Sequence, residues 1–299
     1  MKKHKICKIL LVILAILLCV AFYELLGICI AYKKQPEVSN TTKKETKNGS
    51  WNECSENTER AVIIEKNPEA LLQRVRLIQN AKEEIILSTF AFKSDESGKL
   101  ILGALHDAAD RGVHIRLLVD GMESWIDMEG NPYFYGLSSH ENVEIKLYNK
   151  ANPLKPWKMM GRMHDKYLIA DGKTYILGGR NTYNYFLGDF PGHKNYDRDV
   201  LVVCDEPEKE NSVNQLLEYF ETIWEQEDSG YFHDNKKLAN RKSVKNAVLE
   251  LQNGYQKYFE ENKERICDTD YTDETFETEK IALVSNPIHT GSKEPVVWY

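Results

Sequence analysis

Acidic residues outnumber basic ones in this sequence. Its 299 residues include 39 lysines and arginines against 46 aspartates and glutamates, for a net charge of −7. Residues 1–32 contribute four lysines and one glutamate, so the rest of the chain is more acidic still, at −10. A domain of this charge is a poor general binder of nucleic acid, whose phosphates attract basic surfaces. We therefore expect no nucleic-acid partner.

Cysteines are few and do not gather with histidines. Three of the six, Cys7, Cys19 and Cys29, lie in or near an N-terminal apolar segment. Cys204 ends an apolar run and is expected to be a buried thiol, which leaves a Cys54–Cys267 disulfide open in an oxidising compartment. The sequence contains no Cys/His cluster of the kind that binds metal, and no internal repeat. We predict neither a metal nor another cofactor.

Charge is missing altogether from one stretch near the N-terminus. Residues 9–23 are fifteen consecutive uncharged, mostly apolar residues, and after Glu24 the apolar run continues to Tyr32. As one helix, residues 9–32 would be about 36 Å long, enough to cross a hydrocarbon core of about 30 Å. Residues 1–32 are therefore predicted to be a single transmembrane anchor.

Four lysines crowd the N-terminal flank of this segment: Lys2, Lys3, Lys5 and Lys8. By the positive-inside tendency, they keep the N-terminus in the cytoplasm and place the bulk of the chain outside it. A cleaved signal peptide is the alternative, with Cys29-Ile30-Ala31 as its best cleavage site.

Helix and strand patterns alternate after a polar stretch. Residues 33–60 are polar and aperiodic, and are expected to be a tether. Helix patterns then cover residues 68–80 and 100–111, and strand patterns cover residues 84–92, 113–119 and 143–148. This order predicts an α/β domain over residues 61–205, with a mixed, largely parallel central sheet.

The remaining segments are described by composition and pattern. Residues 120–142 look like a loop because glycine and proline recur in them. Residues 199–203 are predicted to be a strand and residues 212–224 a helix. Residues 206–299 as a whole are predicted to be a helical, acidic segment and the start of a second half, with a last strand at residues 281–285.

A β-hairpin carries the most specific pattern in the chain. The turn signal Asp171-Gly172-Lys173 separates two strand-like runs, residues 163–170 and 174–177. Five residues follow the spacing His-x-Lys-x4-Asp-x6-Gly-Gly, and an asparagine comes two residues later: His164, Lys166, Asp171, Gly178, Gly179 and Asn181.

These residue types suit attack on a phosphodiester. In a strand, His164 and Lys166 are two positions apart, so their side chains project from the same face. Imidazole is a nucleophile that is neutral near neutral pH, and a cation beside it can hold phosphoryl oxygens. Gly178 and Gly179 let the backbone approach a phosphate closely, and the amide of Asn181 can donate to it. Alone, either His164 or Lys166 would be read as structural; the combination indicates a site.

With this pattern, the chain resembles the phospholipase D superfamily over about residues 62–203. The resemblance implies half of an α-β-α sandwich and a metal-independent reaction in two steps. His164 would form a phosphohistidine, and a second histidine would protonate the leaving alcohol. Lys166 and Asn181, with the two glycines, would hold the phosphate, and Asp171 would be the structural and electrostatic acid of the motif.

Relatives also orient the histidine with a carboxylate from the following strand. In the segment Tyr196-Asp197-Arg198-Asp199-Val200, Asp197 is our choice, and Asp199 is not excluded because the two share a strand face. Gly179 stands where some relatives have serine, so a hydroxyl contact is missing.

Active sites of this superfamily use two such motifs, whereas only His164 of this chain begins His-x-Lys. A truncated or split two-domain protein, a homodimer and a degenerate half are all open. The first is favoured, because residues 206–280 resemble the linker between the halves of bacterial cardiolipin synthase-like members. We expect two kinds of partner. One is a second copy of the chain or a separate second half, and the other is membrane phospholipid.

A local excess of basic residues surrounds the motif. Residues 145–181 contain eight basic residues and two acidic ones. Within this stretch, Trp157, Met159 and Met160 lie beside Lys155 and Lys158, where contact with lipid headgroups and plain packing are equally open.

Three functions compete. The first is a membrane-bound phospholipase D or phosphatidyltransferase, including cardiolipin synthase-like transfer, and the apolar segment and the local basic stretch favour it. The second is a nuclease of the same superfamily, against which the acidic domain argues. The third is a non-catalytic half that binds lipid.

Overall fold

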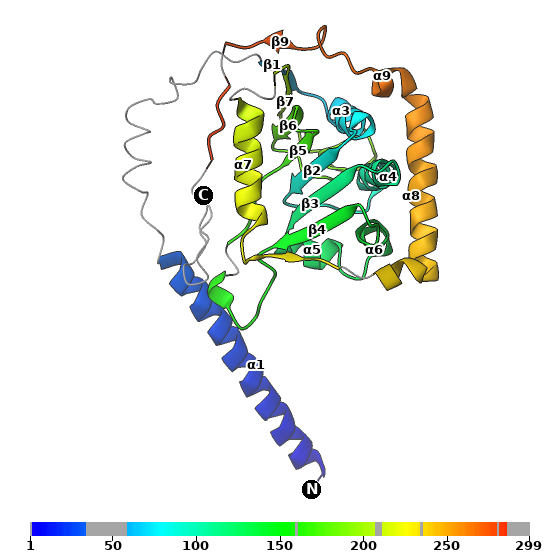
Figure 1. The fold of residues 1–299 in the computed structure, drawn as a ribbon. Coiled ribbons are helices and arrows are strands. Elements are labelled where there is room, and N and C mark those ends of the chain that lie inside the picture. Colours follow the sequence, from blue (N-terminus) through cyan, green and yellow to red (C-terminus); the bar gives the residue numbers. More distant parts are fainter. Residues whose placement is uncertain are drawn as a thin grey trace.

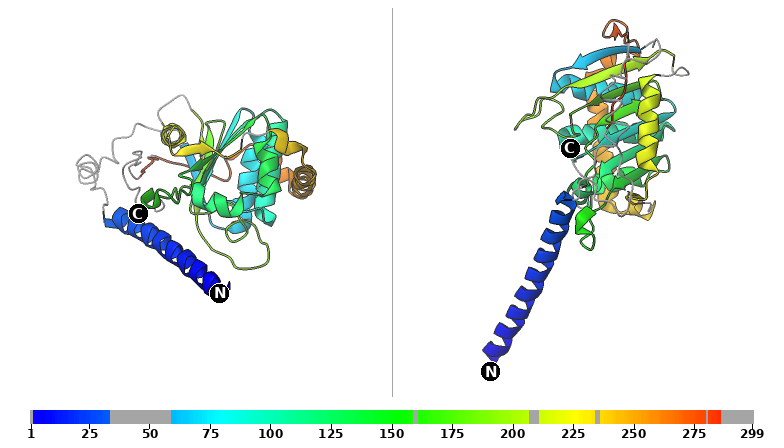
Figure 2. Two further views of the ribbon diagram at one scale, coloured as in Figure 1. Left: turned by 90° about the horizontal axis from the view of Figure 1, so that it is seen from below. Right: turned by 90° about the vertical axis from the view of Figure 1, so that its left-hand side faces the viewer.

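The computed structural model describes residues 2–33, 59–158, 161–206, 211–233, 236–279 and 281–285. These residues form a long N-terminal helix and an α/β domain around one mixed sheet (Figure 1). The helix, α1 (Lys2–Lys33), contains the segment His4–Ile30, which is long and apolar enough to span a membrane. In the right-hand view of Figure 2, α1 projects away from the domain, and its C-terminal part lies closest to it.

The sheet has nine strands in the order β8-β4-β3-β2-β5-β6-β7-β1-β9. The strands are β1 (Glu59–Ile64), β2 (Glu84–Thr89), β3 (His114–Asp120), β4 (Val143–Tyr148), β5 (Tyr167–Ala170), β6 (Thr174–Gly178), β7 (Asp199–Cys204), β8 (Ser229–Tyr231) and β9 (Phe276–Glu277). Among the strand pairs of the described residues, only β2–β3 and β3–β4 are parallel.

The mixed sheet is confirmed, but its parallel part is smaller than predicted. Parallel neighbours need a crossover connection, and only β2, β3 and β4 are joined through helices on one face. β5 and β6 are joined by a tight hairpin, and β7 and β1 continue the antiparallel pairing beyond it.

Helices cover both faces of the sheet. α3 (Asn67–Asn80), α4 (Glu96–Asp110) and α6 (Pro132–Ser138) lie on one face and α7 (Ser212–Trp224) on the other (Figure 1). α8 (Lys242–Glu261) packs over α4 and α6, and α9 (Lys263–Cys267) contacts α3. Short α5 (Gly121–Asp127) follows β3, and the 3-10 helices η2 (Pro156–Lys158) and η3 (Lys236–Asn240) complete the described structure.

α4 shows why these sequences form these elements. Its N-cap, Asp95, accepts a hydrogen bond from the backbone N–H of Gly98, and its apolar residues recur at helical spacing. Ile101, Leu105 and Ala108 are fully buried toward the sheet. On its outer side, Gly103 lets α8 approach so closely that a Cβ there would lie 2.7 Å from the carbonyl oxygen of Leu251.

Three expectations about secondary structure are wrong. Residues 120–142 are not a loop, because Asp120 and Asn131 cap α5 and α6, and Pro132 occupies the first turn of α6. Asp-Gly and Asn-Pro pairs start helices here, although they also signal turns. The predicted tether extends two residues too far, because β1 begins at Glu59. Residues 281–285 form no strand.

Candidate active site

Apart from Asp171, the predicted site residues lie at the edge where the parallel strands end. Tyr167, the first residue of β5, pairs with Ser88 near the C-terminal end of β2. Leu177, near the end of β6, pairs with Tyr167, and Gly178 pairs with Asp199 at the start of β7. In open α/β sheets, ligands bind outside the carboxyl ends of the parallel strands, so this edge is a favourable place for a site.

His164 and Lys166 are brought together, but not by a strand. β5 begins only at Tyr167, so both residues lie in the segment that leads into it. The Lys166 amine donates to the His164 carbonyl oxygen at 2.5 Å. Phe90, just after β2, contacts both: its ring centroid lies 4.9 Å from that of His164 and 5.5 Å from the Lys166 Nζ. The sequence pattern did not single out Phe90, although it follows a buried strand at this edge.

The surroundings of these two residues shift their ionisation. Partial burial of the His164 imidazole lowers its pKa, and the charge of Lys166 lowers that pKa further. Burial lowers the pKa of Lys166 to about 8, against the opposing attraction of Asp165 and Asp197. Near neutral pH, the site therefore holds a neutral imidazole beside a mostly charged amine. This is the protonation state that a nucleophile and its phosphate-binding partner require.

Asp171 lies at the other end of β5, away from His164 and Lys166. It adopts φ 52° in the hairpin turn, where Gly172 follows at φ 59°. Its carboxylate accepts hydrogen bonds from the backbone N–H groups of Lys82, Glu83 and Glu84 at 2.9, 2.8 and 3.0 Å. The geometry makes Asp171 the residue that fixes the hairpin to the start of β2, rather than a group that touches substrate.

The two glycines leave room for carboxylates. A Cβ on Gly178 would lie 2.1 Å from Oδ1 of Asp199, and a Cβ on Gly179 would lie 2.0 Å from Oδ2 of Asp197. Asp197 is exposed, and its charge acts on Lys166. The Asp197 carboxylate thus occupies the space that the Cβ of a serine would take at position 179.

Asp199 has a different environment. Its side chain is fully buried and pairs with two buried arginines, Arg74 at 2.9 Å and Arg180 at 3.2 Å. Only its Oδ1, beneath Gly178, has no hydrogen-bond partner among the described residues. Asp197 and Asp199 thus do not play the same part, although they are two residues apart.

Asn181 is positioned as a donor. Its Oδ1 accepts from the backbone N–H of Ala91 at 3.2 Å, and the neighbouring backbone of Phe92 and Thr182 forms a bridge between the two loops. With its oxygen engaged, the Asn181 amide nitrogen is left to donate toward a ligand. Asn181 is 7% exposed.

A pocket of about 320 Å³ opens beside the motif, on the side of the sheet that α7 covers. His164, Lys166 and Gly178 line it together with Tyr219 of α7 and Leu283 and Val284 of the C-terminal segment. The Tyr219 hydroxyl donates to Asp165 at 2.8 Å, and burial raises the pKa of that carboxyl. Among the described residues, no group of three metal-ligating side chains was found.

A second residue missed in the sequence, Asp120, organises the approach to His164. Its fully buried carboxylate accepts from the backbone N–H of Met163 at 3.0 Å and from Arg162 Nη1 at 2.9 Å. It also caps α5 by accepting from the N–H of Met122. Asp120 is the last residue of β3 and is buried. An acidic residue at the end of an apolar strand is the sequence signal that could have identified it.

Three of the eight basic residues in the local basic stretch form ion pairs inside the protein. Lys158 is buried and pairs with Asp228, Arg162 pairs with Asp120, and Arg180 pairs with Asp199. Lys158 is therefore not available to lipid headgroups, whereas Lys155 is exposed. Met159, Met160 and Cys54 lie outside the described residues, so the proposed lipid contacts of the methionines and the Cys54–Cys267 pairing stay predictions.

Comparison with known proteins gives a family match across this site. The family described as "Cardiolipin synthase, PLD-like domain" matches residues 74–224, about half of the chain, from α3 to the end of α7. The matched stretch contains every residue of the His-x-Lys motif, together with Asp197 and Asp199.

Each of the individual relatives matches a larger share of this chain than of its own length. An uncharacterized protein of Helicobacter pylori strain J99 is 30% identical over 212 residues, which are 66% of this chain and 39% of that protein. Cardiolipin synthase C of Escherichia coli K12 is 28% identical over 171 residues, 52% of this chain and 34% of that one. The chain thus spans well under half the length of these relatives.

Solved structures with a similar fold include NucT from Helicobacter pylori and the phosphatidylserine synthase of Haemophilus influenzae Rd KW20. The first is 18% identical at a TM-score of 0.46, over 58% of this chain and 99% of that one. The second is 16% identical at a TM-score of 0.48, over 73% of this chain and 48% of that one.

Proposed function

The chain belongs to the phospholipase D superfamily, and from this premise we propose that it cleaves or transfers a phosphodiester of membrane phospholipid through a phosphohistidine. The observation that carries the proposal is the pairing of His164 with Lys166 at the strand-end edge. An exposed imidazole with a lowered pKa lies there beside a cation whose amine is held in place by the backbone.

In the proposed reaction, a neutral ring nitrogen of His164 donates its lone pair to phosphorus. The P–N bond forms as the bond from phosphorus to the departing alcohol oxygen breaks, and the acid histidine of a second motif protonates that oxygen. Lys166 and the Asn181 amide offset the negative charge on the phosphoryl oxygens. Water or another alcohol then attacks phosphorus, loses its proton to the same acid histidine and releases His164.

Two features favour lipid as the substrate. α1 is long and apolar enough to hold the domain at a membrane, with the lysine-rich N-terminus in the cytoplasm and the domain outside. Cardiolipin synthases also occur among the relatives, although the chain spans only part of them. The second motif would come from a second copy of this chain or from a separate half, as a homodimer or a complementing pair.

The test uses membranes of cells that produce the full chain, with phosphatidylglycerol supplied and lipid products resolved by mass. We expect new phosphatidic acid or cardiolipin that disappears in His164→Ala. His114→Ala is the matched control, because His114 is exposed at the opposite end of the sheet, at the start of β3.

The outcomes separate the competing functions. Equal products from the chain and from His164→Ala would overturn the proposal. Cleavage of DNA without lipid turnover would favour a nuclease, and binding of lipid with no turnover of either substrate would favour a non-catalytic half.

A further inference from the structure

α5 turns an apolar face away from the protein. Met122, Trp125 and Ile126 are spaced i, i+3 and i+4, so they lie on one side of this helix. Trp125 and Ile126 are each 65% exposed, whereas Gly121 and Ser124 of the same helix are buried. A surface helix normally buries its apolar side, so this inverted arrangement marks a contact surface.

The segment after β4 continues the same surface toward α1. Leu154 in this segment is 78% exposed. The hydroxyl of Tyr23, near the C-terminal end of α1, donates to the carbonyl oxygen of Leu154 at 2.9 Å. Gly27 packs so tightly that a Cβ there would lie 2.3 Å from Cγ of Pro156. The exposed apolar residues therefore lie at the corner where the membrane-spanning candidate meets the domain.

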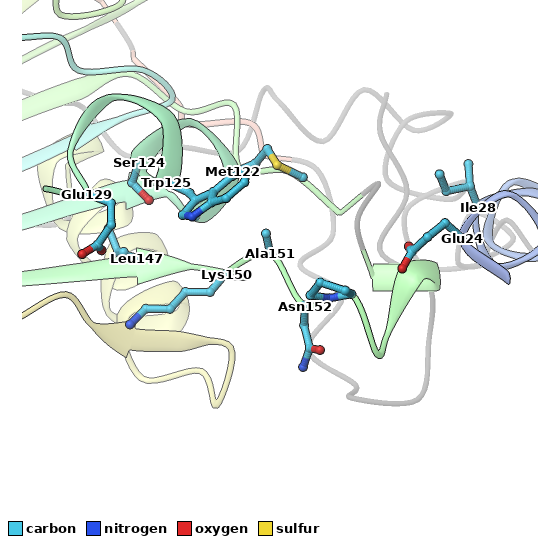
Figure 3. A pocket seen from close by; sticks show the side chains of 12 residues that line it. Glu24, Ile28, Met122, Ser124, Trp125, Glu129, Leu147, Lys150, Ala151 and Asn152 are labelled. Carbon is cyan, nitrogen blue, oxygen red and sulfur yellow. The ribbon is translucent and has the colours of Figure 1, made fainter. Parts of the chain in front are cut away.

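A pocket of about 540 Å³ lies within this surface. Figure 3 shows Met122 and Trp125 of α5 on one side of it and Glu24 and Ile28 of α1 on the other, with Ala151 between them. One wall thus belongs to the candidate membrane span itself. The apolar molecules that reach such a place are the acyl chains of the surrounding bilayer.

We propose that α5 and residues 150–154 form a membrane-docking surface, and that its pocket against α1 holds an acyl chain of a bilayer phospholipid. Tryptophan suits the membrane interface, where its ring meets both apolar chains and water. The surface is coupled to the site, because Asp120 caps α5 and also holds Met163, the residue before His164. Docking of this surface therefore determines how the active-site edge faces the lipid. The inference rests on the proposed function only in taking bilayer phospholipid as the substrate.

The first experiment measures tryptophan emission of the full chain in phosphatidylglycerol nanodiscs, with and without bromine on the acyl chains. The contribution of Trp125 is the difference from Trp125→Phe, and we expect bromine to reduce it by roughly twofold or more. Trp224→Phe is the control: Trp224 is 4% exposed within the domain, so its contribution should not change. An unquenched Trp125 would overturn the docking surface.

The second experiment fills the pocket. Ala151→Phe should remove a phospholipid that the purified chain retains in detergent, as counted by native mass spectrometry. Ala239→Phe places the same side chain in a different, partly buried position of η3 and should leave the lipid in place. Equal lipid retention in the two variants, or none in the unmodified chain, would overturn the acyl-chain site. Neither readout depends on turnover, so failure here is distinct from failure of the proposed reaction.

Discussion

In the proposed reaction, His164 and Lys166 require opposite protonation states, and this fixes the expected pH dependence. The nucleophile must be neutral, so kcat/KM should rise with pH through a pKa below the ordinary histidine value. The phosphate ligand must be charged, so kcat/KM should fall as pH passes the Lys166 pKa of about 8. Lys166→Arg should remove the fall that belongs to Lys166, because arginine stays protonated to a pH above about 12, and should leave only the fall caused by deprotonation of the acid histidine.

The measurement is kcat/KM of both forms on a soluble phosphodiester from about pH 5 to about pH 10. The level of activity should fall in the variant, since arginine is larger, but the profile decides. A fall at about pH 8 that stays in place in Lys166→Arg would show that another group produces it.

Asp197 and Asp199 make separate predictions because only one of them is buried. Asp199→Ala would leave Arg74 and Arg180 as uncompensated buried charges, at a cost of about 3–5 kcal/mol in the free energy of unfolding. Asp197→Ala removes an exposed carboxylate and should change stability by less than about 0.5 kcal/mol. If Asp197 orients His164, its loss should lower kcat/KM by about tenfold or more.

Urea unfolding measures the stability difference, and phosphodiester turnover measures the role of Asp197. A stable Asp197→Ala chain with full activity would exclude Asp197 as the orienting carboxylate and direct attention to the free Oδ1 of Asp199.

At the scale of elements, the sequence predicted the strongly patterned segments well. The strand at residues 143–148 and the helix at residues 212–224 are found with the predicted bounds, since apolar periodicity marks both. α5 and α6 were missed because each is seven residues long, too short to show a period. The candidate site shows the same division. The sequence singled out motif residues that are close along the chain, whereas Phe90 and Asp120 come near them only through the pairing of strands in the sheet.

The contact between α4 and α8 offers a matched pair of glycine substitutions. Gly103→Ala should reduce the free energy of unfolding by about 1–3 kcal/mol, because the methyl group would meet the backbone of α8 at Leu251. Gly254→Ala, within α8 itself, meets nothing within 4 Å and should raise stability by up to about 1 kcal/mol.

Thermal or urea unfolding of the two variants, beside the unmodified chain, gives the result directly. Equal stability of Gly103→Ala and Gly254→Ala would mean that α8 does not pack closely on α4. α8 would then be only loosely tied to the domain.

At the scale of the whole molecule, the number of motifs governs the expected assembly. If two copies share one site, cells making equal amounts of the unmodified chain and His164→Ala should show about one quarter of full activity per chain, because only one pair in four has both histidines. Independent chains would show about one half. Differently tagged copies allow the mixed pair to be purified and assayed alone, and a mixed pair with half activity would contradict a shared site.

The ends of the sheet also constrain any assembly. The outermost strands, β8 and β9, have only three and two residues, so each offers few backbone N–H and C=O groups to another chain. Short margins of this kind resist continuation of the sheet from one molecule into the next. A partner is therefore expected to associate through side chains, and crowding of many chains on one membrane should not by itself lead to fibrous aggregates.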